Sequence, residues 1–253
     1  MSREGGQGGE RPAARIKIAV AEQPVLLITG ASSGIGEATA RQAAEHGYRV
    51  VLAARREDEL HRLAGELGGD DRAVARRCDV TDWADVEGLG ETAMQHFGRL
   101  DAVFANAGFG AKRGFLESSP QHWEAMIDTN VLGVALTIRA TLPLLLDAKR
   151  GHYVITGSVA GRRVLPGSLY SATKWAAGAI AEALRQELRQ MHDSDIRVTL
   201  LAPGMVDTPF FDQRPGSGAL AADDVARAAL FALSQPEHVD VSEILIRPAS
   251  QTA

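Results

Sequence analysis

Short, almost continuously apolar runs alternate with helix-type segments along most of this chain. The runs cover residues 25–29, 49–54, 73–76, 101–107, 152–157, 196–202 and 243–248. A strand with one solvated face alternates apolar and polar residues, whereas a parallel strand covered on both faces stays apolar throughout. The sequence therefore predicts an α/β fold, with one doubly wound parallel sheet of about seven strands and helices on both faces.

One folded domain is expected over residues 24–253, because the composition shows no break and no internal repeat there. Before it stands "MSREGGQGGERPAAR", which is rich in glycine and charge and lacks the apolar stretch of a signal peptide. That composition predicts a disordered tail over residues 1–23.

Charge, cysteine and histidine content exclude several classes of protein. The net charge of −5, without a long basic run, gives no support for nucleic-acid or membrane-surface binding, and no apolar run approaches the roughly 20 residues that span a bilayer. The single cysteine, Cys78, rules out an internal disulfide and is expected to be a buried thiol in a reducing compartment. The seven histidines show no metal-ligand spacing. We therefore expect a cytoplasmic protein with no metal, nucleic-acid or membrane partner.

A glycine-rich turn, "TGASSGIG" at residues 29–36, follows the first strand and opens a helix. Glycines let the backbone turn tightly and approach a ligand, and the following helix offers free N–H groups to a pyrophosphate. Glycines also make plain turns, but a strand before and a helix after favour dinucleotide binding. The candidate cofactor-binding residues here are Gly30, Ser32, Ser33, Gly34, Ile35 and Gly36.

The end of the second strand predicts which dinucleotide is bound. An NAD site usually places an acid there, but this chain reads Ala54, Arg55, Arg56. Guanidinium groups can hold a 2′-phosphate through charge-assisted hydrogen bonds, which favours NADP(H) over NAD. Arg55 is the stronger candidate, since a surface arginine next to a loop would explain Arg56 equally well.

Tyr170 and Lys174 stand four residues apart in a predicted helix over residues 169–188, so they share one face. They could be ordinary exposed helix residues. As a functional pair they form an acid/base, because a free tyrosine has a pKa of about 10 and lowering it by about 3 units requires roughly 4 kcal/mol. A unit charge about 4 Å away at an effective dielectric of 20 supplies a similar amount, so Lys174 is expected to lower the pKa of Tyr170.

Seven motifs occur in the order of a known family. They are residues 29–36, 78–82, 105–108, 127–133, 156–161, 170–174 and 202–208. Together they resemble the short-chain dehydrogenase/reductase family, in its single-domain branch, over residues 24–248. The ending "SEILIRP" is similar to that of NADP-dependent 3-hydroxy acid and serine dehydrogenases. The resemblance implies a Rossmann-type, dinucleotide-binding catalytic domain.

The resemblance also implies roles for particular residues. The catalytic set is Asn130, Ser158, Tyr170 and Lys174. In the family, the serine donates a hydrogen bond to the substrate oxygen, the asparagine holds a water that links the lysine to solvent, and the lysine binds the nicotinamide ribose. The implied cofactor contacts are Asp79 and Val80 near adenine, Asn106, Ala107 and Gly108 after the fourth strand, and Pro203, Gly204, Val206 and Thr208 near nicotinamide. Structural roles remain open for three of them: a turn cap for Ser158, a helix polar group for Asn130 and a helix N-cap for Asp79.

Three segments should surround the substrate: residues 109–115, 161–168 and the lid-like 205–218. A substrate carboxylate could bind one of their basic residues, which are Lys112, Arg113, Arg162, Arg163 and Arg214. We therefore expect an NADP(H)-dependent oxidoreductase that interconverts a secondary alcohol and its ketone. The leading candidates for the alcohol are 3-hydroxy acids. The alternatives are a 3-oxoacyl-type ketoreductase and a non-catalytic NADP(H)-binding sensor.

A homotetramer or homodimer is also implied by the resemblance, through helix pairs that include the helix carrying Tyr170. The apolar positions available for this on the helix are Ala176, Ala179, Ile180, Ala183 and Leu184. The sequence leaves open whether they face the core or a second copy of the chain.

Overall fold

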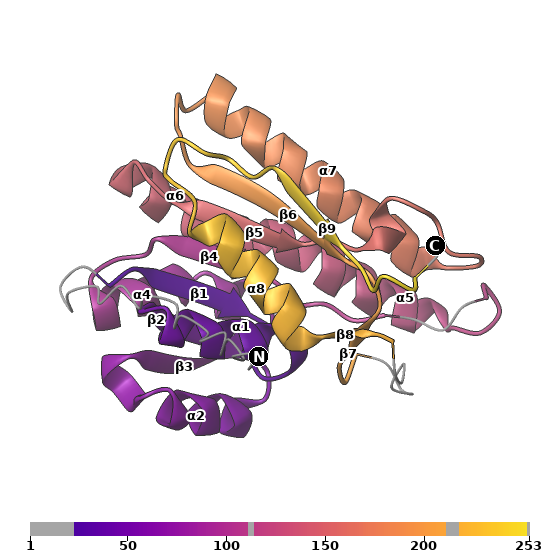
Figure 1. Cartoon of the computed structure of the whole chain (residues 1–253), viewed down its shortest axis with the longest axis horizontal. Helices are drawn as coiled ribbons and strands as arrows, with labels where there is room; N and C mark the ends of the chain where they lie inside the picture. Colours follow the sequence, from indigo (N-terminus) through magenta and orange to yellow (C-terminus); the bar gives the residue numbers. More distant parts are fainter. Residues whose placement is uncertain (1–22, 111–113, 211–217, 252–253) are drawn as a thin grey trace, which may run out of the picture.

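The computed structural model describes residues 23–110, 114–210 and 218–251. Its main sheet has seven parallel strands in the order β3-β2-β1-β4-β5-β6-β9 (Figure 1). The strands are β1 (Val25–Thr29), β2 (Arg49–Ala54), β3 (Ala73–Arg77), β4 (Ala102–Ala105), β5 (His152–Thr156), β6 (Arg197–Pro203) and β9 (Glu243–Ile246). The predicted doubly wound parallel sheet is therefore confirmed. The predicted tail lies outside the described residues, except for Gln23.

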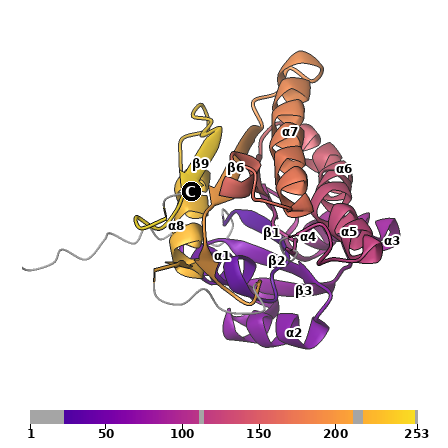
Figure 2. The same ribbon diagram turned by 90° about the vertical axis from the view of Figure 1, so that its right-hand side faces the viewer.

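Helices cover both faces of the sheet. One layer holds α1 (Gly34–Glu45), α2 (Glu57–Glu66) and α8 (Ala222–Leu233), and the other holds α4 (Leu89–Phe97), α6 (Gly133–Ala148) and α7 (Leu169–Gln190). Figure 2 shows α1 and α8 on one side of the sheet and α6 and α7 on the other. Shorter elements are α3 (Trp83–Val86), α5 (Pro120–Ile127), a π-helical turn at Asp128–Leu132 and single 3₁₀ turns at Gly69–Asp71 and Val159–Gly161.

Every strand of the main sheet except the edge strand β9 contributes to two hydrophobic cores, one per face. In β1, Leu27 packs into the core under α4, α6 and α7, while Leu26 and Ile28 pack into the core under α1, α2 and α8. All three side chains are fully buried. This two-sided burial is the physical reason for the continuous apolar runs, since each such side chain contributes about 1.5–3 kcal/mol when removed from water.

The sheet reverses its winding at β1. This strand pairs with β2 on one side and with β4 on the other, so the chain crosses the sheet between β3 and β4. The loops that leave β1 and β4 therefore diverge at their carboxyl ends and open a crevice, which is where doubly wound folds bind ligands.

A small two-stranded ribbon was not expected from the sequence. Its strands, β7 (Val206–Asp207) and β8 (Leu220–Ala221), pair in parallel, so that the start of the predicted lid segment lies beside residues that directly follow its end. Residues 211–217 of that segment lie outside the described residues, as do residues 111–113.

One helical run, Pro120–Ala148, is long and apolar enough to cross a membrane by length and composition, with a mean hydropathy of 1.6 and 33% of its apolar window buried. The expectation that no apolar run approaches this length was therefore too strong. The run joins α5, the π-helical turn and α6, and α6 contributes Val134, Ile138 and Leu145 to the core of the sheet. A core helix of a soluble domain passes the same test, so this run is weak evidence for a membrane span.

Candidate active site

The glycine-rich turn after β1 is held in a conformation that side chains would disturb. Gly30 has φ +68°, and a Cβ there would lie 2.9 Å from the Cα of Ala107. A Cβ on Gly36 would lie 2.2 Å from the carbonyl oxygen of Gly30. The turn therefore folds directly onto the first turn of α1, and these two glycines are required by close backbone contacts.

The first turn of α1 leaves its N–H groups available to a ligand. Ser33 is the N-cap residue, but its side chain makes no capping hydrogen bond. Instead its hydroxyl receives a hydrogen bond from Arg56 Nη2 at 2.6 Å, and the same nitrogen donates to Ser32 Oγ at 2.9 Å. Uncapped N–H groups at a helix start, with a guanidinium beside them, form a site suited to phosphate.

Arg55 points to a neighbouring part of the crevice. It lines a cavity of about 300 Å³ together with Asp79, Thr81, Phe109, Ala125, Asp128 and Thr129. The sequence left Arg56 open between a cofactor contact and a surface arginine, and its bonds to Ser32 and Ser33 tie it to the glycine-rich turn. Both arginines therefore border the predicted cofactor path.

Asp79 forms a tight turn and does not cap a helix. Its Oδ1 accepts hydrogen bonds from the Thr81 amide at 3.0 Å and the Thr81 hydroxyl at 2.8 Å. Burial raises the pKa of Asp79, but these bonds and the charge of Arg55 outweigh it and lower the pKa overall. The N-cap of α3 is Asp82, so the capping alternative for Asp79 is wrong. Val80 is a core residue that packs against Gly133, which leaves only its backbone to face a ligand.

Asn106 joins the ends of three strands. Its Nδ2 donates to the Thr29 carbonyl at 3.1 Å, and its Oδ1 accepts from the Thr156 hydroxyl at 3.1 Å. The hydroxyl of Thr29 accepts from the amides of Asn106 and Ala107 at 3.0 and 3.2 Å. Gly108 follows, and a Cβ there would lie 3.0 Å from Asn130 Oδ1 and 3.7 Å from Lys174 Nζ.

Asn130 lies in the π-helical turn and is 1% exposed. Its Nδ2 donates to the Phe109 carbonyl at 2.8 Å and to Thr173 Oγ1 at 3.1 Å, while its Oδ1 accepts from the Phe109 amide at 3.0 Å. These bonds anchor the loop after β4 to α7. Asn130 Oδ1 and Lys174 Nζ both lie beside Gly108.

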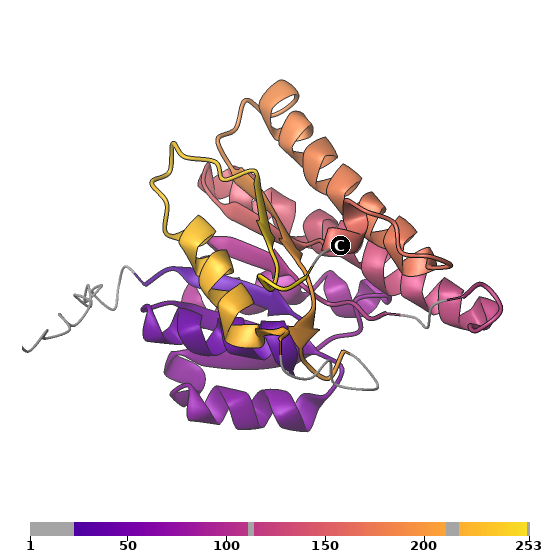
Figure 3. The same cartoon turned by 45° about the vertical axis from the view of Figure 1, so that its right-hand side comes forward.

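Tyr170 and Lys174 lie on one face of α7, as their spacing predicts, and Ser158 lies near Tyr170. Ser158 follows β5 and is 8% exposed, and its hydroxyl accepts a hydrogen bond from the Ala160 amide at 3.1 Å. Ser158 therefore caps a turn, as the structural alternative from the sequence proposed. Ser158 is also the side chain that opposes the rise of the Tyr170 pKa. Lys174 is 4% exposed, and its Nζ lies 5.7 Å from the centre of the Tyr170 ring and donates to the Thr156 carbonyl at 2.9 Å. Figure 3 shows α7 with the 120–132 segment alongside its first half.

The expected lowering of the Tyr170 pKa by Lys174 is not found in the chain by itself. Burial raises the pKa of Tyr170 to about 12, against the opposing effect of the Ser158 hydrogen bond, and lowers the pKa of Lys174 to about 8. Desolvation penalises the charged form of each group, and it is the largest influence on both pKa values. The chain alone therefore holds Tyr170 as a phenol, which is the form that donates a proton.

The segment after β6 closes the site from the α8 side. Pro203 ends β6, and the Gly204 amide donates to the Ile246 carbonyl at 2.7 Å. Val206 is 5% exposed and belongs to the core, whereas the Thr208 methyl lies against Gly34, where an added Cβ would come within 3.3 Å. Of the four residues expected near nicotinamide, Gly204 thus contacts β9 and Thr208 contacts the glycine-rich turn.

Two contributors to the site were missed by sequence reasoning. Thr156 holds Lys174 through its carbonyl, and Phe210 packs edge-on against Tyr170 with ring centres 5.6 Å apart. Phe210 also contacts Gly110, where a Cβ would lie 2.8 Å from the ring. Thr156 begins the 156–161 motif, but no role for it followed from the sequence. Phe210 belongs to no motif, although it stands in the segment that the sequence assigned to the substrate.

Arg162 is not free to bind a substrate carboxylate. Its Nε and Nη2 each donate to a Glu243 carboxylate oxygen at 2.8 Å, in a bidentate ion pair with β9. Arg163 is exposed, and Lys112, Arg113 and Arg214 lie outside the described residues. Of the five predicted cations, Arg162 is therefore corrected to a structural residue.

No group of three or more His, Cys, Asp or Glu residues within the described ranges could hold a metal ion. Cys78 is 1% exposed, and burial raises the pKa of its thiol to about 12. It is therefore a structural thiol, as predicted, and no nucleophile.

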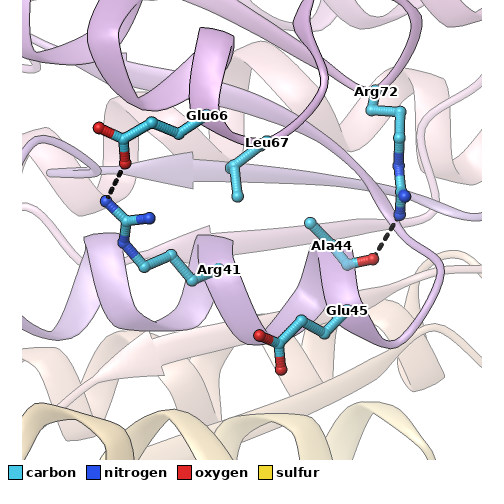
Figure 4. Close-up of a pocket in the computed structure, with 6 residues that line it drawn as sticks. All are labelled: Arg41, Ala44, Glu45, Glu66, Leu67 and Arg72. Atoms are coloured by element: carbon cyan, nitrogen blue, oxygen red, sulfur yellow. Dashed lines mark hydrogen bonds and ion pairs between the residues drawn. The ribbon is translucent and has the colours of Figure 1, made fainter.

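A second cavity lies between α1 and α2, away from every predicted site residue (Figure 4). It measures about 410 Å³ and is lined by Arg41, Ala44, Glu45, Glu66, Leu67 and Arg72. Its cations are engaged, since Arg41 pairs with Glu66 at 2.6 Å and Arg72 donates to the Ala44 carbonyl (Figure 4). The smaller cavity at Arg55 and Asp79 is the one that adjoins the candidate active site.

Comparison with known proteins agrees with this geometry. A family model described as short chain dehydrogenase matches residues 24–216. An uncharacterized oxidoreductase of Staphylococcus saprophyticus is 42% identical over 241 residues, which cover 90% of this chain and 97% of that protein.

Two solved structures share the fold over most of the chain. An alcohol dehydrogenase from the archaeon Thermococcus sibiricus, complexed with 5-hydroxy-NADP, is 35% identical with a TM-score of 0.82, covering 92% of this chain and 99% of its own. A serine dehydrogenase in its closed form, complexed with NADP⁺, is 30% identical with a TM-score of 0.84, covering 90% and 96%.

Proposed function

The chain belongs to the short-chain dehydrogenase family, and we propose that this oxidoreductase interconverts a secondary alcohol and its ketone with Tyr170 as the acid/base. The observation that carries the proposal is the cluster of Ser158, Tyr170 and Lys174 at the start of α7. There the buried Lys174 ammonium lies 5.7 Å from the centre of the Tyr170 ring, and Ser158 acts on the pKa of the tyrosine.

The residues of the crevice fit a nicotinamide dinucleotide. The uncapped first turn of α1 suits a pyrophosphate, and the cavity at Asp79 and Arg55 lies beside the end of β2, where the adenine half of a dinucleotide is expected. When bound, this cofactor donates or accepts the hydride and, in its oxidised form, brings a positive ring charge.

The protein groups then manage the oxygen of the substrate. In reduction, Ser158 donates a hydrogen bond to the carbonyl oxygen and Tyr170 gives it the proton that completes the alcohol. In oxidation, Tyr170 accepts the alcohol proton, and Lys174 stabilises the phenolate. A positive charge in this position favours the phenolate, so Lys174 acts against the burial penalty.

Preference for NADP(H) over NAD(H) is supported by Arg55 and Arg56. Both border the crevice, and Arg56 reaches the serines of the glycine-rich turn. Solved relatives hold NADP in some cases and NAD in another, so the family alone leaves this preference open. We expect kcat/KM to be higher with NADPH than with NADH and the preference to collapse in the Arg55→Ala, Arg56→Ala double variant. Equal values in the wild type would contradict it.

Among secondary alcohols, 3-hydroxy acids are favoured by the likeness to a serine dehydrogenase. The pairing of Arg162 with Glu243 removes one candidate carboxylate ligand, which favours neutral alcohols or a 3-oxoacyl-type ketoreductase as the alternative. A panel of 3-hydroxy acids, neutral alcohols and 3-oxoacyl thioesters, each assayed with both cofactors, separates these substrates. Turnover of neutral alcohols without turnover of any short 3-hydroxy acid would reject the acid class.

The same panel tests whether the chain catalyses anything. A non-catalytic NADP(H) sensor would bind NADPH and oxidise none of it with any ketone. We expect NADPH absorbance to fall in the presence of at least one ketone, and unchanged absorbance across the panel would favour the sensor.

A homodimer or homotetramer is proposed through the outer face of α7. Leu184 is 4% exposed and belongs to the core, but Ala179 and Ala183 are exposed, and Trp175 beside them is 48% exposed. An apolar stripe of small residues on a helix is suited to close packing against a second copy. Light scattering after size exclusion should give a multiple of 26.9 kDa, and a strictly monomeric mass would refute it. We also propose a cytoplasmic location, which cell fractionation would test.

A further inference from the structure

The ammonium of Lys174 makes one hydrogen bond to a protein group within the described residues, from Nζ to the Thr156 carbonyl at 2.9 Å. The side chain is 4% exposed, so bulk water competes little for this contact. The position of that carbonyl therefore decides where the ammonium lies relative to Tyr170.

Thr156 is itself held from the opposite side. It is the last residue of β5, and its hydroxyl donates to Asn106 Oδ1 at 3.1 Å. Asn106 Nδ2 donates in turn to the carbonyl of Thr29 at 3.1 Å, directly before Gly30. Hydrogen bonds thus run without a break from the glycine-rich turn through Asn106 and Thr156 to Lys174.

Uncharged groups otherwise surround the ammonium. Asn130 comes from the π-helical turn and Gly108 from the loop after β4, and a Cβ on Gly108 would lie 3.7 Å from Nζ. Tyr170, one turn earlier on α7, is the titratable group that faces Lys174. Within the described residues, no second charge is available to hold the ammonium if the Thr156 carbonyl moves.

We propose that the hydroxyl of Thr156 positions Lys174 for the reaction by fixing, through Asn106, the carbonyl that the ammonium binds. This role rests on the proposed function. It makes Thr156 a positioning residue, since the hydroxyl acts through its bond to Asn106. The strand itself has no need of the hydroxyl, because valine has the same shape and an equal or higher preference for β-structure.

A pair of substitutions separates the hydroxyl from the shape of the side chain. Thr156→Val keeps the shape and leaves Asn106 Oδ1 without its donor, whereas Thr156→Ser keeps the hydroxyl. We expect Thr156→Val to lower kcat/KM for ketone reduction about fivefold to tenfold, the effect of one lost hydrogen bond. The pH profile of alcohol oxidation should move upward by roughly half a unit, because a displaced ammonium stabilises the phenolate less. Thr156→Ser should stay within about twofold of the wild type, with an unmoved profile.

Controls distinguish this role from general damage. Thr92→Val removes a hydroxyl that bonds only within α4, to the Gly88 carbonyl, and should change neither rate nor profile. Thermal melting checks the fold of each variant, and Thr156→Ala replaces the valine variant if that chain does not fold. Wild-type rates and profile in Thr156→Val, or equal losses in the serine and valine variants, would overturn the proposal.

Failure of the proposed function has a different signature. A wild-type chain that turns over no ketone, or a Tyr170→Phe variant as active as the wild type, would refute the acid/base assignment and with it any role for Thr156 in the reaction. A dead Tyr170→Phe variant beside an unaffected Thr156→Val variant would refute the Thr156 role alone.

Discussion

Buried His152 should make the fold sensitive to acid. The side chain is 1% exposed at the start of β5, and its Nε2 lies 2.7 Å from the hydroxyl of Thr199. That hydroxyl gives its single hydrogen to the Val241 carbonyl at 2.6 Å, so it must accept from Nε2–H. Nδ1 therefore carries the lone pair, and it has no hydrogen-bond partner in the described part of the chain.

Protonation of this imidazole is strongly opposed in the folded state. Burial and the charge of Arg197 lower the pKa of His152 to about 3, whereas an unfolded chain has the ordinary value of 6.5. Below pH 6.5 the unfolded state binds the extra proton, so the free energy of unfolding falls by about 1.4 kcal/mol per pH unit until the folded pKa is reached. At pH 4.5 the accumulated loss is roughly 2–3 kcal/mol, a large share of the stability of a typical domain.

Urea denaturation of wild type and His152→Gln between pH 7 and pH 4.5 measures this loss. The variant cannot take up the proton, so its free energy of unfolding should fall less steeply, by about 1.4 kcal/mol per pH unit below pH 6. His238→Gln, at an exposed histidine, should retain the wild-type slope. Parallel curves for wild type and His152→Gln would show that the imidazole is protonated or hydrated in the folded chain, and would refute the reasoning.

Three further perturbations follow from close contacts. Gly36→Ala places a Cβ 2.2 Å from the Gly30 carbonyl oxygen, so NADPH binding measured by fluorescence should weaken at least about tenfold. The control Gly65→Ala, with open space around it, should leave the NADPH affinity unchanged and stabilise α2 by up to about 1 kcal/mol. Equal NADPH affinities of the two variants would contradict this. Arg197→Met removes the guanidinium that binds carbonyls at the end of α8, among them those of Ala232 and Gln235. The free energy of unfolding measured in urea should therefore fall by about 2–4 kcal/mol. A fall of less than about 1 kcal/mol would contradict this role of Arg197. Phe210→Ala removes the ring packed on Tyr170, so the kcat/KM ratio of bulky to small ketones should rise about tenfold or more; an unchanged ratio would mean that this ring does not limit substrate size.

Most strands could be predicted because they are buried on both faces, β9 at the sheet edge being the exception, but the ends of the strands depend on contacts between distant residues. The fourth apolar run was expected to continue to residue 107, yet β4 ends at Ala105. The hydroxyl of Thr29 accepts hydrogen bonds from the amides of Asn106 and Ala107, so these amides are not available for pairing in the sheet. Nothing near Asn106 in the sequence indicates that partner, and β7 and β8 are too short to produce a period.

The candidate site was predictable where spacing along one element decides the geometry. Tyr170 and Lys174 share a helix, so their common face follows from the helical repeat. Their pKa values do not, because desolvation depends on what the rest of the chain packs around them. The pairing of Arg162 with Glu243, and the carbonyl of Thr156 beneath Lys174, likewise join segments far apart in the sequence and became visible only in the fold.

Tyr170→Phe tests the central claim most directly, because it removes one oxygen from the site and leaves the ring that packs against Phe210. Ketone-dependent NADPH oxidation should fall about 100-fold or more, the usual contribution of a general acid, while the dissociation constant of NADPH stays within about threefold of the wild type. A variant that binds NADPH normally and still reduces ketone at the wild-type rate would contradict the claim that this hydroxyl carries the proton.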